Sequence, residues 1–153
     1  MARDFTPPKT DARTIVNPVG LAYMFRLQAN FDARRIEQTP RGGRAYRAIT
    51  GGNVEGPRLT AAVYPDSGGD YGQIRADGVE DVMARFMLRA ANGEWIYVSH
   101  TGYRRPDGYH RLHAWFDADA GGPYAWLNDA VVLVHAAESA NGRSATFTYH
   151  QAI

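Results

Sequence analysis

The chain has no cysteine, one lysine and no long apolar run. Without cysteine it can form neither a disulfide framework nor a thiolate nucleophile. None of its apolar stretches approaches the about 20 residues that a membrane-spanning helix needs. The first residues, Met1 to Phe5, are not followed by the apolar segment of a secretory signal. These absences predict a protein that contacts no membrane and remains in the cytoplasm.

Excess charge of one sign is also missing, because the formal net charge is +1. Nucleic-acid-binding proteins concentrate basic side chains to neutralise phosphates, so we expect no nucleic-acid partner. We interpret the densest basic stretch as a solvated loop face; it contains Arg34, Arg35, Arg41, Arg44 and Arg47. The preference for arginine over lysine still matters, since guanidinium groups recognise carboxylates and stack on rings as ammonium groups do not.

What the chain does contain is a series of short β-type segments separated by glycine-rich turns. Its 153 residues suffice for one domain with one core. Strand patterns occur at residues 21–29, 46–64, 71–75, 95–98, 112–116, 130–137 and 145–149. They predict an all-β fold, an antiparallel barrel or sandwich, over residues 21–153. Prolines and few large apolar residues before it predict an extended N-terminal arm over residues 1–20.

Residues 80–91 are ambiguous. Val79, Val82, Met83, Phe86 and Met87 follow a helical spacing, and the Asn-Gly pair after them could end a helix. The same Asn-Gly pair is also a strong hairpin signal that leads into another apolar strand. We predict a strand here, because the segments on both sides are strands.

A glycine frame occupies the segment Gly51-Gly52-x-x-x-Gly56. A dinucleotide-binding loop would open a helix directly afterwards, but Pro57 and a β-rich segment follow instead. We therefore expect the glycines to let a barrel strand bend or to admit a neighbouring backbone. Glu55 and Arg58 bracket this bend, either as a structural ion pair or as a catalytic pair.

Several ionisable residues are candidates for acid/base chemistry. His100 and His135 lie within apolar strands, where they either face a pocket as proton carriers or form hydrogen bonds in the core. Asp70 precedes an aromatic segment; it either caps a turn or points into a cavity where burial raises its pKa. His110 and His113 would lie on opposite faces of a strand, so we predict no metal site.

Aromatic side chains lie on or beside most of the expected strands. Most of them belong in a core, but a subset at the mouth of a barrel would suit a planar or terpenoid small molecule. The residues are Tyr23, Phe25, Tyr71, Phe86, Trp95, Tyr97, Trp115, Phe116, Tyr124 and Trp126.

Seven blocks of sequence together resemble the family of domain of unknown function 3237 (DUF3237). They cover residues 39–42, 49–59, 69–71, 75–78, 84–86, 96–98 and 124–128, of which the second and the last are the longest and most specific. The resemblance implies a compact antiparallel β-barrel, similar to calycin or allene-oxide-cyclase barrels, that self-associates. It also implies cofactor-free acid/base steps such as ring closure, isomerisation or addition to a double bond.

The resemblance also implies a set of pocket residues. The motif positions are Glu55, Arg58, Asp70, Tyr97, Tyr124, Trp126 and Asn128. Many relatives place an aspartate two residues before the position of Arg85, whereas this chain has Met83. The chain therefore either lacks that acid or uses another one.

These observations favour a cofactor-independent lyase, isomerase or cyclase that acts on a small, mostly apolar, oxygen-bearing metabolite. Arg58 and Tyr97 would stabilise an enolate or phenolate oxygen, while Asp70 or His100 moves the proton. The expected substrate-binding residues are Glu55, Tyr23, Phe86, Tyr124, Trp126, Asn128 and His135. We expect no cofactor and no metal, and the expected partners are a small molecule and further copies of the chain, as a dimer or a larger homo-oligomer.

Two other functions remain open from the sequence. One is a binding protein or carrier that holds a hydrophobic small molecule without changing it. The other is an interaction module, because a barrel of about eight strands can be filled entirely by its own side chains.

Overall fold

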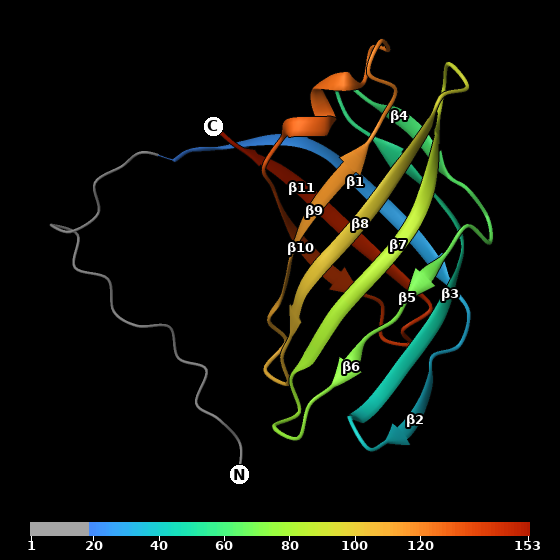
Figure 1. Ribbon diagram of the computed structural model, residues 1–153, viewed down its shortest axis with the longest axis vertical. Coiled ribbons are helices and arrows are strands. Elements are labelled where there is room, and N and C mark those ends of the chain that lie inside the picture. The colour runs from blue at the N-terminus through green and yellow to red at the C-terminus, as the bar shows by residue number, and fades with distance from the viewer. Residues whose placement is uncertain (1–18) are drawn as a thin grey trace, which may run out of the picture.

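A computed structural model describes residues 19–153 as one antiparallel β-barrel (Figure 1). Of the expected N-terminal arm, all but Val19 and Gly20 lies outside the described residues. The strands are β1 (Leu21–Phe31), β2 (Arg35–Thr39), β3 (Gly42–Glu55), β4 (Thr60–Val63), β5 (Gly69–Asp70), β6 (Gln73–Ile74), β7 (Glu80–Ala90), β8 (Trp95–Arg104), β9 (His110–Asp117), β10 (Val132–Glu138) and β11 (Ser144–Ala152). A single 3₁₀ turn, η1 (Ala125–Asp129), interrupts them.

The barrel closes because β1 pairs with both β11 and β3. The closed ring runs through eight strands in the order β1, β11, β10, β9, β8, β7, β4 and β3. Beyond the end of β4, the short strands β5 and β6 take its place between β3 and β7 and pair with both. Strand β2 pairs with the first residues of β3. The predicted all-β barrel is therefore confirmed.

The predicted strand over residues 80–91 is confirmed as β7, which pairs with β8 from Glu80 to Arg89. Its burial alternates from Glu80 to Ala90, which is the period of a strand with one face inside the barrel. Of the strand expected over residues 71–75, only Gln73 and Ile74 are in a strand, β6, while β5 ends before this segment, at Asp70. Strand β2 and turn η1 were not predicted; all five residues of β2 are exposed, so no burial pattern marks it.

The expected role of the glycine frame is confirmed. Gly51 and Gly52 adopt φ values of 155° and 143°, and a Cβ atom at Gly52 would overlap the carbonyl oxygen of Gln28 on β1. The pairing of β1 with β3 also skips one residue of β3 at this point, between Gly51 and Ile49. The frame therefore bends β3 around the barrel and brings its backbone close to β1.

The two ends of the barrel differ in chemistry. At the η1 end, Leu127 is buried and Tyr124 and Trp126 pack against the apolar core. At the opposite end, which we call the polar end, β7 begins, β8 ends, β9 begins and β10 ends. Each of these termini carries an ionisable residue, namely Glu80, Arg104, His110 and Glu138. Among residues 19–153, no helix has the length and apolar character needed to cross a bilayer.

Candidate active site

Strand register places a set of polar residues in one row across the inside of the barrel. Arg47 on β3 pairs with Asp70 on β5, Asp70 pairs with Ala84 on β7, and Ala84 pairs with His100 on β8. Adjacent strands lie about 4.8 Å apart, so the backbones of Asp70 and His100 are about 10 Å apart. Only the methyl group of Ala84 lies between them in this row, which leaves room inside the wall.

A second row lies four residues closer to the polar end. Glu80 on β7 pairs with Arg104 on β8, which pairs with His110 on β9. Glu80 and His110 are 5% exposed. The interior of this part of the barrel is therefore lined by charged and titratable groups as well as by hydrocarbon.

A small cavity lies between the two rows. It provides about 10 Å³ for the centre of a water molecule, which is enough for about one such molecule. It is lined by Phe31, Ile49, Gly69, Asp70, Val82, Ala84, Phe86, His100, His110, Leu112 and Phe147.

Three of the side chains around this cavity have a buried polar atom without a hydrogen-bond partner. The atoms are Oδ1 of Asp70, Nδ1 of His100 and Nε2 of His110. Leaving such a group unpaired costs about 1–3 kcal/mol, and native proteins contain few of them. Their convergence on one cavity marks it as the candidate site.

The carboxyl group of Asp70 is buried beside a guanidinium group. Burial raises its pKa above the ordinary value of 3.8 and outweighs the guanidinium of Arg47, which lowers it, while the charge of Glu80 raises it further. Nη2 of Arg47 lies 3.2 Å from Oδ2 of Asp70, and the other oxygen, Oδ1, is buried without a hydrogen-bond partner. A carboxyl group in this environment can exchange a proton nearer to neutral pH than an exposed aspartate can.

The imidazole of His100 is held by Tyr149. Nε2 of His100 lies 2.6 Å from the hydroxyl oxygen of Tyr149, and both side chains are fully buried. Burial lowers the pKa of His100 to about 3 and raises that of Tyr149 well above 10, so both groups are neutral at pH 7. The contact fits two tautomers: the phenol donates to Nε2 when the ring proton is on Nδ1, and Nε2–H donates to the phenol oxygen when the ring proton is on Nε2. In either tautomer, Nδ1 of His100 is buried without a hydrogen-bond partner.

His110 connects the cavity to the outside. It lines the internal cavity and also an external groove at the polar end, together with Arg104, His135 and Glu138. Burial lowers the pKa of His110 to about 4, with a partial opposing effect of the Glu138 charge. The ring is therefore neutral at pH 7.

A chain of alternating charges closes the polar end. From one terminus to the other it runs Arg34, Glu80, Arg104, Glu138, Arg47 and Asp70. The consecutive nitrogen–oxygen distances are 2.7, 3.7, 2.9, 2.6 and 3.2 Å. Since these residues come from distant strands and one loop, the chain of charges links the strands to one another at the polar end.

The sequence profile of a protein family described as "Protein of unknown function (DUF3237)" matches residues 19–149. The chain belongs to the DUF3237 family. A search of curated proteins found no match to it.

Solved structures with the same barrel are similar to this DUF3237 chain. A β-barrel-like protein from Acinetobacter baumannii is 20% identical, with a TM-score of 0.79, and the alignment covers 98% of this chain and 100% of that one. A conserved protein of unknown function from Rhodopseudomonas palustris is 22% identical, with a TM-score of 0.81 and coverage of 90% and 100%. An enzyme from Penicillium herquei is 19% identical, with a TM-score of 0.75 and coverage of 92% and 98%.

Three of the site residues predicted from the sequence of this DUF3237 protein lie together at the cavity: Asp70, His100 and Phe86. The ring of Phe86 meets the imidazole of His100 edge-on, with 5.4 Å between the ring centroids. The site therefore combines the expected acid/base groups with an aromatic wall.

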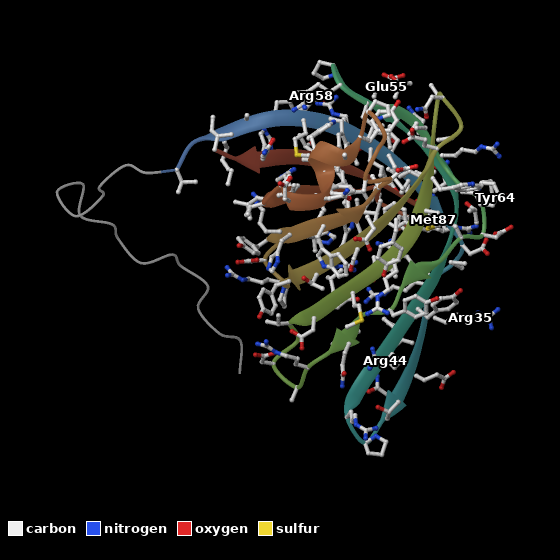
Figure 2. All side chains as sticks on the ribbon, turned by 45° about the horizontal axis from the view of Figure 1, so that its top comes forward. Arg35, Arg44, Glu55, Arg58, Tyr64 and Met87 are labelled. Carbon is white, nitrogen blue, oxygen red and sulfur yellow. The ribbon has the colours of Figure 1, made fainter. Side chains whose placement is uncertain are left out.

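Five other nominated residues lie toward the η1 end. Arg58 is exposed and stacks on the ring of Trp126 at 3.7 Å, and Glu55 is exposed near it (Figure 2). Tyr124 packs against the apolar core. Asn128 has a structural role: its side-chain amide accepts a hydrogen bond from the backbone N–H of Ala118 and donates one to the carbonyl oxygen of the same residue. None of these five lines the cavity.

The remaining three nominated residues lie on the outer wall of the barrel. Tyr23 packs beside His150, and Tyr97 packs beside Trp115. His135 does share a face with Leu133, as the sequence indicates, but that face is exposed. The position two residues before Arg85, occupied by Met83, is also on the outer wall. An acid there would not reach the cavity.

Sequence reasoning missed several residues of the site, above all Arg47. The interpretation of Arg47 as part of a solvated face is wrong, since it is 2% exposed and its guanidinium lies 4.0 Å from the ring of Phe31. Arg47 lies two residues from both Ala45 and Ile49, so all three share the buried face of β3, and this spacing could have identified it. The same spacing marks His110, which shares its face with Leu112.

Of the residues that the structure describes, no group of three or more His, Cys, Asp or Glu side chains is arranged to hold a metal ion.

Proposed function

We propose that this DUF3237 protein is a cofactor-independent acid/base enzyme, a lyase, isomerase or cyclase, that acts at the cavity of Asp70, His100 and His110. The observation that supports this most is the convergence of three unpartnered atoms of buried ionisable side chains on one cavity. Buried groups with perturbed pKa values are common at catalytic sites. The Penicillium herquei protein of the same fold is called an enzyme.

The chemistry follows from the protonation states. In the tautomer we propose, the phenol of Tyr149 donates to Nε2 and the ring proton of His100 is on Nδ1. This N–H donates a hydrogen bond to a substrate oxygen, which stabilises the negative charge that develops there. The carboxylate of Asp70 removes a proton from the substrate, and its protonated form returns that proton to carbon. In a ring closure of this kind, an O–H group adds across a double bond within one molecule, so no atom is lost and no electron acceptor is needed. His110 supplies a second proton carrier.

The apolar lining sets the substrate class. Phe31, Phe86 and Phe147 surround the polar atoms, so the substrate is mostly hydrocarbon with a few oxygen groups. In the closed form the cavity admits about one water molecule, and a metabolite enters only when side chains at the polar end move. Arg104 and Glu138 are suited to this movement, since their side chains are 30% and 17% exposed and line the external groove.

A turnover assay tests the proposal. We would incubate the protein in D₂O with 2-prenylphenol and a set of simple enones, and follow deuterium incorporation and ring closure by NMR. Asp70→Asn should lower the rate by about 100- to 10,000-fold, the usual contribution of one general acid or base. Ala84→Leu should abolish it by filling the space between Asp70 and His100. Ala62→Leu, on the exposed face of β4, is the matched control.

The alternatives give different results. Equal rates in wild type and in folded Asp70→Asn would remove this residue from the mechanism. Compounds that bind to both proteins but are recovered unchanged and without deuterium would indicate a carrier. Failure of every compound to bind would indicate an interaction module whose interior is filled by its own side chains and a single water molecule.

A further inference from the structure

One carboxylate oxygen at the polar end lies between two guanidinium groups. Oε1 of Glu138 is 2.6 Å from Nη2 of Arg47 and 2.9 Å from Nη1 of Arg104. Arg47 comes from the middle of β3, Arg104 from the end of β8 and Glu138 from the end of β10. The barrel therefore brings two cations from distant strands to a single anion position.

Of the two arginines, Arg47 is the unusual one because its charged side chain is buried. Its side chain is 2% exposed, so its charge has almost no water to solvate it. Its Nη1 donates to the carbonyl oxygen of Gly142, and its Nη2 also lies 3.2 Å from Oδ2 of Asp70, but its Nε is buried without a hydrogen-bond partner. A buried guanidinium with an unused donor requires an anion nearby and can accommodate one that bonds it more completely than Glu138 does.

Glu138 lies at the external groove, with 17% of its side chain exposed. It lines the external groove with Arg104 and His110, and His110 also lines the internal cavity. Glu138 is followed by the turn of residues 139–143, so its side chain is carried at the end of a strand rather than within the wall. Arg104 lines the groove, and Glu138 is the residue that joins it to the buried Arg47.

We propose that Arg47 and Arg104 form a carboxylate-binding site for the substrate, and that Glu138 occupies this site until the substrate displaces it. The substrate is then a small carboxylic acid with an apolar body: the carboxylate bonds the guanidinium groups, and the body extends toward Phe31 and His110. The inference rests on the proposed function for the position of the reacting groups, but the anion site can be tested by binding alone. Planar guanidinium groups match a carboxylate better than an ammonium group does.

The test measures binding of benzoate by calorimetry to the full chain. Glu138→Gln keeps the size of the side chain and removes the competing charge. We expect benzoate to bind this variant at least about ten-fold more tightly than wild type, a difference of about 1.4 kcal/mol. Benzyl alcohol, the neutral analogue, should bind both proteins equally. Arg104→Gln added to Glu138→Gln should abolish the gain.

Two controls keep the test decisive. Glu37→Gln removes one negative charge from the exposed strand β2, and it should leave benzoate binding unchanged. If Glu138→Gln does not fold, Glu138→Asp retracts the carboxylate by one methylene group and should give a smaller gain. An equal gain for benzyl alcohol or for Glu37→Gln, or no gain in any folded Glu138 variant, would overturn the proposal.

Binding and turnover separate the two proposals. A gain in benzoate affinity without any Asp70-dependent turnover would support the anion site and count against the enzyme. Asp70-dependent turnover with no gain in benzoate affinity would support the enzyme and reject the anion site.

Discussion

Replacing Tyr149 by phenylalanine removes one hydroxyl group from the centre of the barrel and leaves the ring in place. Tyr149 is fully buried, and its ring packs against Phe25 and Phe116 with centroid distances of 4.5 and 5.9 Å. These contacts remain in the variant. The specific loss is the 2.6 Å hydrogen bond to Nε2 of His100, which becomes a second unpartnered nitrogen on a buried ring.

The magnitude follows from that lost partner. Leaving a buried polar group unsatisfied costs about 1–3 kcal/mol, whereas the missing oxygen atom alone leaves little empty space. For a domain of this size, 1 kcal/mol corresponds to a change of about 2–4 °C in melting temperature. We therefore expect Tyr149→Phe to melt about 2–12 °C below wild type.

The assay combines thermal denaturation with ¹⁵N NMR of the histidine rings. Tyr23→Phe is the matched control, because Tyr23 is half-exposed beside His150 and should change stability by less than about 0.5 kcal/mol. In wild type the proton of His100 should be on Nδ1, and in Tyr149→Phe the tautomer is no longer fixed. Equal melting temperatures for the two variants, or a wild-type proton on Nε2, would refute the reasoning.

Two further predictions concern the buried ionisable groups. Lowering the pH from 7 to 5 should reduce the free energy of unfolding by about 2 kcal/mol for each of His100 and His110. In the unfolded chain these imidazoles bind protons below a pH of about 6.5. In the folded protein their pKa values are about 3 and 4, so they stay neutral over this range. The raised pKa of Asp70 acts in the opposite direction, since it removes stability as the pH rises, and denaturant titrations at both pH values measure the sum. Gly72→Ala should destabilise the protein by about 1–3 kcal/mol, because its Cβ atom would overlap Oε1 of Glu80 and displace that carboxylate from its arginine partners. An unchanged melting temperature in this variant would show that Glu80 can move without cost.

The fold was largely predictable from local patterns. Alternation of apolar and polar residues identified most of the strands, and turn residues separated them. Residues 80–91 show the limit of this reasoning, since their spacing also fits a helix. Pairing of β7 with β4, β5, β6 and β8 decides the matter, because a strand in a closed ring satisfies its backbone groups on both sides.

The site was only partly predictable. Asp70, His100 and Phe86 were nominated and do meet at one cavity, whereas His135 lies on the outer wall. Alternation along a strand separates two faces but does not say which face is inside where both carry apolar side chains. In β10 the exposed face holds Leu133, so the pattern alone misleads.

The sequence by itself determined that the chain forms strands, that its glycines bend one of them, and that a few acids and histidines fall within apolar segments. Only the tertiary structure decided which of these residues meet. Arg47, Glu80 and Glu138 are far apart in the chain, and the register of the closed ring brings them to one end of the barrel. Register depends on every strand pair around the ring at once, which no local stretch of sequence contains.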